Sequence, residues 1–260
     1  MEFIDRRVLG AIEFVDAVTA ARMRGALRVE PVDERVVVRA NRSSLYVIRS
    51  APGLEAHLDQ FEDMPATPAF GALEFDIQVR DPVNRYLPRV TRIALPRLDA
   101  PANDVRSVLK PIVVPLFPAA AAAVQPGWAV LRVRVQGDGA AHPGLANVLV
   151  VATPQTPGVA KVTAMTDARG EALVAIAGVQ PVLAQGAAPA LLTRSFDCQL
   201  ALIVDRRVVR AAPDAAPLAD PDTIELDRIE GHIDVSLIPQ PLVSLSAGKS
   251  LRATAEIPWP

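Results

Sequence analysis

Cysteine and aromatic residues are scarce in this sequence of 260 residues, a length that suffices for one large domain or two of ordinary size. The single cysteine, Cys198, excludes a disulfide within the chain and fits a reducing compartment. Aromatic residues make up only 4% of the chain, whereas 50% of it is hydrophobic, with alanine ahead of valine and leucine. The composition therefore predicts an aliphatic core.

Long apolar runs are also missing. The longest, at 112–124, is interrupted by Pro115 and Pro118 and is too short to span a bilayer. The opening stretch, 1–7, does not fit a signal peptide. We therefore expect a cytoplasmic chain without a membrane span.

Neither sign of charge dominates, since Lys and Arg total 27, Asp and Glu total 29, and the net charge is −2. No basic tail and no stripe of aromatic and basic residues occurs, so nucleic acid is not an expected partner. The arginines of the N-terminal region form either a docking surface for an acidic partner or ordinary surface charge, and we expect the latter. They are Arg6, Arg7, Arg22, Arg24 and Arg28.

The residue patterns of common catalytic sites are absent as well. The sequence has no GxSxG elbow, no Walker loop and no GxGxxG. His57, His142 and His232 stand in no metal-ligand spacing, and each is expected on a loop or strand surface. We therefore expect no catalytic residue, no cofactor and no metal, and we do not expect an enzyme.

Cys198 is expected to be a structural thiol, because no histidine is near it in sequence and buried thiols are inert. The alternation of its strand is taken to place it on the face opposite to Phe196, Leu200 and Leu202. A nucleophilic role is the less favoured alternative.

Two loops are rich in acidic residues. A hard-cation site is conceivable in either loop, but the spacing matches no calcium loop, so we expect solvated surfaces. The first loop carries Glu55, Asp59, Glu62 and Asp63 beside His57, and the second carries Asp214, Asp220, Asp222 and Asp227.

Short strands are what the sequence indicates instead. Its 24 Pro and 14 Gly are scattered between apolar runs, which fits many short strands and argues against long helices. The clearest run is 73–79, where apolar residues at odd positions alternate with polar residues at even positions. This alternation predicts a half-buried strand.

One polar turn occurs twice. In the first copy Asn41 opens the turn and Ser44 follows three positions later. In the second copy Thr166 and Asp167 open the turn, and Gly170 follows Asp167 by three positions. Asp and Asn side chains bond their own backbone two residues on, and Gly tolerates positive φ, so both copies are predicted to be hairpin turns.

The order of strands and turns also repeats in the two halves. We therefore predict an all-β chain with two tandem antiparallel β-sandwich domains of an Ig-like or transthyretin-like kind. The first covers 1–97 and the second covers 128–210, with a Pro/Ala-rich connector arm at 98–127 between them. A C-terminal β extension at 211–260 has no counterpart in the first half.

The end of this extension is predicted to be a hairpin formed by 242–245 and 251–257. An isolated hairpin is marginal in water, so it must pack on the second domain or on another subunit. Trp259, which lies between two prolines, is the candidate residue for such a partner contact.

The segment Thr166-Asp167-x-x-Gly170-x-Ala172 resembles the turn of carboxypeptidase regulatory-like and transthyretin-like β-sandwich domains. That family has an aromatic residue where this chain has Ala172. The first copy keeps the aromatic residue as Tyr46 but has Asn41 and Ser44 in place of Asp and Gly. The resemblance implies accessory, non-catalytic modules, so it brings no active site with it.

A wider pattern is a sandwich, an arm with Leu116-Phe117-Pro118 that leads into Pro126-Gly127-Trp128, and a second sandwich. It resembles accessory proteins of contractile, phage-tail-like injection particles. This resemblance implies a non-enzymatic structural or accessory component of a large assembly. Its partners would be other protein subunits, and self-association is compatible with it.

Two other functions stay open. A carbohydrate- or peptide-binding module would need exposed aromatic residues, for which Tyr46, Tyr86, Trp128 and Trp259 are available besides the phenylalanines. For a hydrolase with an unfamiliar site, the three histidines are the obvious catalytic candidates.

Overall fold

The computed structural model describes residues 8–59, 65–139, 141–177, 182–183, 191–192, 195–212, 217–224 and 235–259. The chain is all-β, as predicted, and forms two compact units. Unit 1 consists of residues 1–16, 20–83 and 88–116, and unit 2 of residues 17–19, 84–87 and 117–260.

Unit 1 contains two sheets and one short helix, α1 (Glu55–Asp59). One sheet has the order β3-β4-β1-β7, and the other has the order β2-β5-β6. The strands are β1 (Gly10–Asp16), β2 (Arg28–Pro31), β3 (Val37–Ala40), β4 (Tyr46–Ser50), β5 (Leu73–Arg80), β6 (Arg89–Leu95) and β7 (Ile112–Leu116).

The alternation at 73–79 does form a half-buried strand, β5, which confirms that prediction. Ile77 and Val79 are buried on one face. On the other face Asp76 pairs with Arg92 of the neighbouring strand β6, with 2.9 Å between the carboxylate Oδ1 and the guanidinium Nε. The period of two residues thus separates the core face from the charged face.

Unit 2 contains a sheet of order β11-β10-β15-β17, in which β18 also pairs with β15, and a sheet of order β12-β8-β19. Two short pairs, β9 with β16 and β13 with β14, and a 3₁₀ turn at Pro221–Thr223 complete the described elements. The strands are β8 (Ala129–Gly137), β9 (Leu145–Ala146), β10 (Leu149–Pro154), β11 (Val162–Met165), β12 (Glu171–Ile176), β13 (Val182–Leu183), β14 (Leu191–Leu192), β15 (Ser195–Asp205), β16 (Arg210–Ala211), β17 (Val235–Pro239), β18 (Val243–Ser246) and β19 (Ser250–Ile257).

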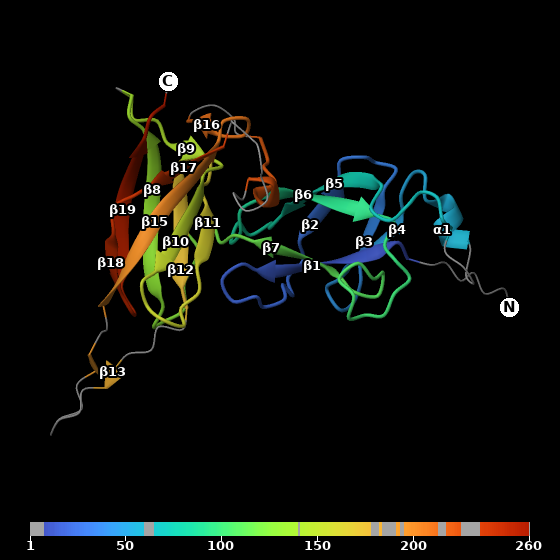
Figure 1. Ribbon diagram of the computed structural model, residues 1–260, viewed down its shortest axis with the longest axis horizontal. Coiled ribbons are helices and arrows are strands. Elements are labelled where there is room, and N and C mark those ends of the chain that lie inside the picture. The colour runs from blue at the N-terminus through green and yellow to red at the C-terminus, as the bar shows by residue number, and fades with distance from the viewer. Residues whose placement is uncertain are drawn as a thin grey trace. The chain divides into compact units, whose positions relative to one another are not determined.

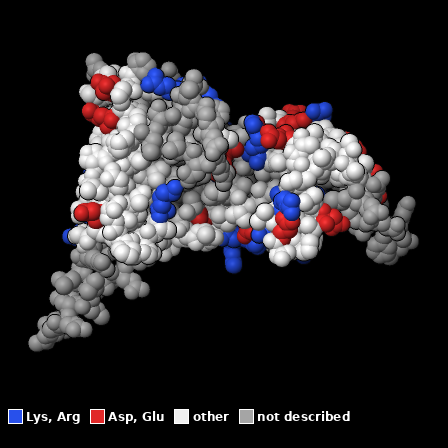
Figure 2. All heavy atoms as spheres, viewed as in Figure 1, with Lys and Arg blue, Asp and Glu red and all other residues white. Residues whose placement is uncertain are grey.

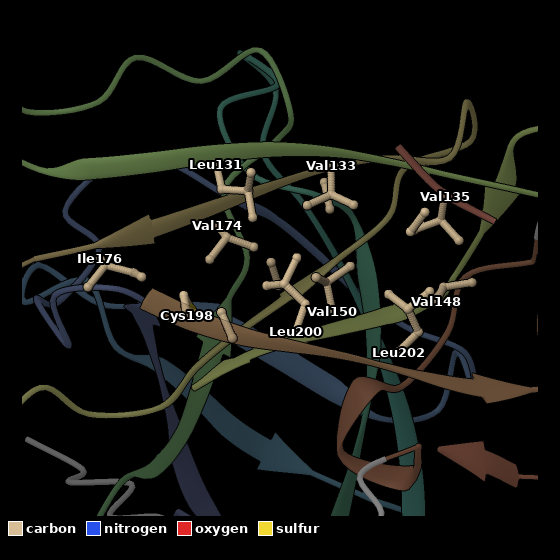
Figure 3. Close-up of a cluster of buried hydrophobic side chains, with 14 of the residues drawn as sticks. Leu131, Val133, Val135, Val148, Val150, Val174, Ile176, Cys198, Leu200 and Leu202 are labelled. Carbon is tan, nitrogen blue, oxygen red and sulfur yellow. The ribbon is translucent and has the colours of Figure 1, made fainter. Parts of the chain in front are cut away.

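The core of unit 2 lies between these two sheets. Figure 3 shows side chains of β8 and β12, such as Leu131 and Val174, pointing toward those of β10 and β15, such as Val150 and Leu200. The cluster is aliphatic apart from Phe196 and Cys198, with the half-buried Trp259 packed against it. The low aromatic content therefore leads to the aliphatic core that the composition predicts.

The predicted orientation of Cys198 is wrong. Its side chain is buried in the core on the same face as Leu200 and Leu202 (Figure 3). Residues two positions apart on a strand share a face, so the alternation itself requires this orientation.

The first and last strands of each unit are parallel neighbours. In unit 1, β1 pairs in parallel with β7 and antiparallel with β4. In unit 2, β8 pairs in parallel with β19 and antiparallel with β12 (Figure 1). The prediction of purely antiparallel sheets is therefore wrong for these first-to-last pairs.

The order of strands in the sheets also assigns the predicted connector and the C-terminal extension to the two units. The predicted connector, 98–127, contains β7, the last strand of unit 1. The extension, 211–260, supplies β17, β18 and β19 to unit 2. Because β7 pairs in parallel with β1 as β19 pairs with β8, the expectation that the extension has no counterpart in the first half is wrong for β19.

The expected C-terminal hairpin is not formed either. Strand β18 pairs with β15 in one sheet, and β19 pairs with β8 in the other. The turn at 246–249 therefore leads the chain from one sheet to the other. Each run still has one apolar face, but the two faces line the core from opposite sides.

The two polar turns share one hydrogen-bond pattern. The Asn41 Oδ1 accepts from the backbone N–H groups of Ser43 and Leu45, both at 2.9 Å. The Asp167 Oδ1 accepts from those of Arg169, at 2.8 Å, and Glu171, at 3.0 Å. The residue at the third position after each has positive φ, which is 59° at Ser44 and 79° at Gly170.

The surroundings of the two turns differ. The Asn41 turn joins β3 and β4, which pair with each other. The Asp167 turn joins β11 and β12, which belong to different sheets, so its prediction as a hairpin is wrong. Thr166, just before it, donates from Oγ1 to the Leu145 C=O (2.7 Å) and accepts at Oγ1 from the Val148 N–H (2.9 Å).

Substitution of Gly170 by alanine should destabilise unit 2. A Cβ there would lie 2.6 Å from the Leu145 nitrogen and would also clash with the Val135 oxygen, in addition to the strain of positive φ. We expect a loss of about 2–4 kcal/mol in the free energy of unfolding. Urea unfolding followed by tryptophan fluorescence measures it, since Trp128 and Trp259 both belong to unit 2.

Gly158 provides the matched control. Its φ is 81°, but a Cβ there meets nothing within 4 Å. Gly158→Ala should therefore cost only about 1 kcal/mol, the cost of the left-handed conformation alone. Equal losses in the two variants would show that the close backbone contacts at Gly170 are unimportant.

Candidate interaction surface

Strand β19 is a long and exposed sheet edge. Its eight residues pair on one side with β8, and no other described segment pairs with its second side. The strand contains no proline between Ser250 and Ile257. An edge of this length with free backbone groups can accept a further strand.

Two hydrogen bonds show which backbone groups face the open side. The C=O groups of Lys249 and Ile257 accept from the N–H groups of Val130 and Asp138 on the β8 side, both at 3.0 Å. Residues of a parallel pair face the neighbouring strand alternately, so the odd-numbered residues of β19 face β8. The N–H and C=O groups of the even-numbered residues, 250–256, therefore point to the open edge.

Two comparable edge strands, β7 and β12, are protected. In unit 1, β7 holds the place that β19 holds in unit 2, but it includes Pro115, which lacks an N–H. The Pro115 C=O accepts from Nη1 of the buried Arg89 at 2.8 Å. In unit 2, the opposite edge strand β12 is buried from Ala172 to Ile176. Strand β19 lacks each of these protections.

The outer face beside this edge has a hollow of about 630 Å³ with three arginines. Arg132 of β8 is the direct neighbour of Arg252 of β19, and Arg134 is the neighbour of Thr254. All four line the hollow together with Glu171, Ala120 and Ala121. Arg134 and Arg252 are exposed, and no described carboxylate forms an ion pair with them.

Glu256 is the acidic residue of β19. Its Oε1 accepts from Nε2 of Gln136 at 2.8 Å and lies 3.7 Å from Nδ1 of His142. The side chain is still 54% exposed, so it can meet a further partner. Along the open edge, Arg252 and Glu256 thus place opposite charges on either side of Thr254.

Trp259 lies at the end of the same strand and packs on its own unit. It is half-buried against the core of unit 2, and its Cβ and Cγ lie close above Gly137. Its backbone N–H donates to Oδ1 of Asp138 at 3.0 Å. The contact that the structure shows for Trp259 is therefore internal to the chain.

The histidines do not form a site together. His57 is buried in α1 instead of exposed as expected, and its ring nitrogens have no described partner. It borders a hollow of about 660 Å³ in unit 1 with Arg97, Asp104 and Arg106. In that hollow the carboxylate of Asp104 pairs with Arg106, which lowers the pKa of Asp104 to about 2. His142 is exposed, and His232 lies outside the described residues.

The acidic loops give no metal site in the part of the chain that the structure describes, where no group of three or more metal-ligating side chains occurs. Asp220 instead accepts from the Asp222 N–H at the start of the 3₁₀ turn. Four of the acidic residues lie outside the described residues, namely Glu62, Asp63, Asp214 and Asp227.

The arginines of the N-terminal region pair locally. Arg22 pairs with Glu13, and Arg28 pairs with Glu30 at 2.7 Å. Arg6 and Arg7 lie outside the described residues. On the face shown in Figure 2, basic and acidic side chains are interspersed, and that face shows no broad basic patch.

Comparisons with known proteins identify no family. No family model and no curated protein matches the chain. Among solved structures, a leucine-rich repeat protein from Bacteroides thetaiotaomicron VPI-5482 aligns with 96% of this chain and 26% of its own, at 10% identity and a TM-score of 0.23. Similarity this low carries no argument about fold or function. Separately, none of the described helices has the length and apolarity needed to cross a membrane.

The sequence alone does not predict this surface, although the arginines that form it can be identified in the sequence. Arg132, Arg134 and Arg252 all occupy alternating positions of apolar runs. Only the parallel pairing of β8 with β19 brings them together, and these strands are far apart in sequence.

The buried thiol of Cys198 should make unit 2 sensitive to alkaline pH. Burial raises the pKa of Cys198 from its usual 9.0 to about 11. The unfolded thiol ionises first, so this contribution to stability is complete below pH 9 and is lost as the pH rises toward 11. Urea unfolding followed by tryptophan fluorescence should show the loss.

Cys198→Ala is the control for this prediction. It should be less stable at neutral pH because it leaves a small cavity, but it should lack this part of the alkaline decline. An identical decline in both proteins would show that the thiol does not contribute.

Proposed function

We propose that the chain is a non-enzymatic structural or accessory component of a large protein assembly, and that the open edge of β19 forms one of its contacts there. The observation that carries this proposal is the edge itself. Strand β19 has eight residues and no proline, and no described segment pairs with its second side. Strand addition at such an edge gives affinity from backbone hydrogen bonds, as in other β-augmentation complexes.

The detailed architecture of the two units is part of the same proposal. We take the two units as tandem β-sandwiches of a transthyretin-like kind that arose from one fold. Supporting this are the matching first-to-last parallel pairs, the antiparallel neighbours β4 and β12, and the shared hydrogen-bond pattern at Asn41 and Asp167. Modules of this kind serve as scaffolds, which agrees with a structural role, and we place that role in the cytoplasm because the single cysteine fits a reducing compartment.

A contractile, phage-tail-like particle is the assembly that we propose, from the resemblance of the sandwich, arm and sandwich pattern. The test is sedimentation of the tagged chain from cells that express its neighbouring genes. We expect it in a fast-sedimenting particle that also contains tube, sheath or baseplate proteins, as identified by mass spectrometry. A chain that sediments only as a small species, from genes unrelated to such particles, would contradict the proposal.

The arginine hollow favours a second candidate function, the binding of an acidic peptide. Three guanidinium groups with one carboxylate, Glu171, leave an excess of positive charge. The lining residues include no aromatic ring of the kind on which sugars stack, so a peptide fits this hollow better than a carbohydrate.

Titration calorimetry with a peptide of alternating valine and glutamate would test this candidate. Arg134→Ala should weaken binding about tenfold, because charge-assisted hydrogen bonds are lost. The matched peptide with glutamine in place of glutamate should bind weakly, and Arg206→Ala, an exposed arginine outside this sheet, should bind as the wild type does. Equal binding of both peptides would exclude the candidate.

A further inference from the structure

The open edge of β19 has a charge pattern that is complementary to itself. Its even-numbered residues, which face the open side, run Ser250, Arg252, Thr254 and Glu256. Arg252 and Glu256 lie at equal distances on either side of Thr254. When two such edges meet antiparallel with Thr254 opposite Thr254, each Arg252 lies opposite a Glu256 of the other copy.

From this pattern we infer that the partner strand at the edge is β19 of a second copy of the chain. The two copies would be related by a twofold axis at Thr254, and their sheets would join into one continuous sheet. This inference rests on the proposed function, because it names the partner of the same edge. A twofold contact of this kind is closed, since both copies use the same surface.

The backbone geometry permits this pairing. Residues that face each other across an antiparallel pair must both direct their N–H and C=O groups to the shared edge. Residues 252, 254 and 256 all do so, as the hydrogen bonds of Lys249 and Ile257 to the β8 side require. In this register even-numbered residues lie opposite even-numbered residues, so the N–H and C=O groups that both copies direct to the shared edge at the centre are paired.

The charges select this register among the neighbouring ones. A shift that centres the axis on residue 252 would place Arg252 opposite Arg252, and a centre at residue 256 would place Glu256 opposite Glu256. Like charges directly opposite each other destabilise a strand pair. A centre at residue 253 or 255 would place no opposite charges face to face.

The inner face of the strand supports the same register. Leu251 is a large hydrophobic residue that is 40% exposed in the single chain. In the pairing centred on Thr254 it lies opposite Ile257 of the second copy, while Ala253 lies opposite Ala255. The exposed leucine thereby gains an apolar neighbour next to the edge of the core.

The side chains that carry the charges are placed for this contact. Glu256 is held by Gln136 at 2.8 Å, and Arg252 is exposed beside Arg132 on the outer face. The negative charge of a second copy's Glu256 would relieve the repulsion between the two arginines. The second copy thus supplies the carboxylate that no described residue supplies to Arg252.

Sedimentation equilibrium of the purified full chain tests the inference by charge reversal. The wild type should form a dimer at micromolar concentrations. Arg252→Glu and Glu256→Arg should each raise the dimer dissociation constant about tenfold or more, because each places like charges opposite each other. The double variant R252E/E256R restores opposite charges and should return the constant close to the wild-type value.

Three further variants test the backbone contact and provide its controls. Thr254→Pro removes an N–H from the open edge without removing one that faces β8, so it should abolish the dimer while fluorescence shows unit 2 folded. Thr254→Val keeps the N–H and should dimerise as the wild type does. Arg206→Glu changes a charge outside β19 and should leave the constant unchanged.

The inference is overturned by a monomeric wild type, by single charge variants that dimerise as well as the wild type, or by a double variant that stays monomeric. Should a charge variant fail to fold, the comparison of Thr254→Pro with Thr254→Val decides. The particle experiment is independent of these results. A monomer that still sediments with particle proteins would overturn only the self-pairing, and a dimer that joins no particle would overturn only the proposed assembly.

Discussion

The parallel pairing of the first and last strand closes each unit, and the rest of the architecture depends on it. Strands β1 and β7 enclose most of unit 1 in the sequence, and β8 and β19 enclose most of unit 2. The two strands of such a pair are far apart in the sequence, so their pairing requires closure of a long loop. This closure costs conformational entropy. In each unit the last strand lies at the edge of its sheet, beside the first.

Close backbone contact at the Asp167 turn is the second constraint on unit 2. The turn leads the chain from one sheet to the other, and it brings Gly170 against the backbone of Gly144 and Leu145. Thr166 adds two hydrogen bonds to the same segment through its hydroxyl group. The Asn41 turn has the same internal bonds but joins two paired strands, so the same local sequence serves a hairpin in one unit and a change of sheet in the other.

Local features of this fold could be predicted from the sequence, and distant pairings could not. The half-buried strand at 73–79 follows from its period of two residues. The role of Asp167 in its turn follows from side-chain chemistry, but which sheets the turn joins does not, because pairing depends on partners far away in the sequence. For the same reason the sequence predicts a connector at 112–116, where the structure has β7, and a pairing of β18 with β19 that the structure does not form. The orientation of Cys198 is a different case, because the correct period would have placed it with Leu200 and Leu202.

The contrast between β7 and β19 has a consequence for assembly. These strands hold the same topological place, yet β7 includes Pro115, whose C=O is bound by Arg89, and β19 has neither feature. Edge strands of stable proteins usually carry such protection, because an open edge invites pairing with other chains. If both strands were open, one chain could pair at both and assembly could continue without limit. With β7 blocked, pairing through β19 stops at two copies, because a twofold contact uses the same edge of each chain. The twofold contact thus limits the proposed pairing to two copies by itself, and the block at β7 removes one further edge at which copies could be added.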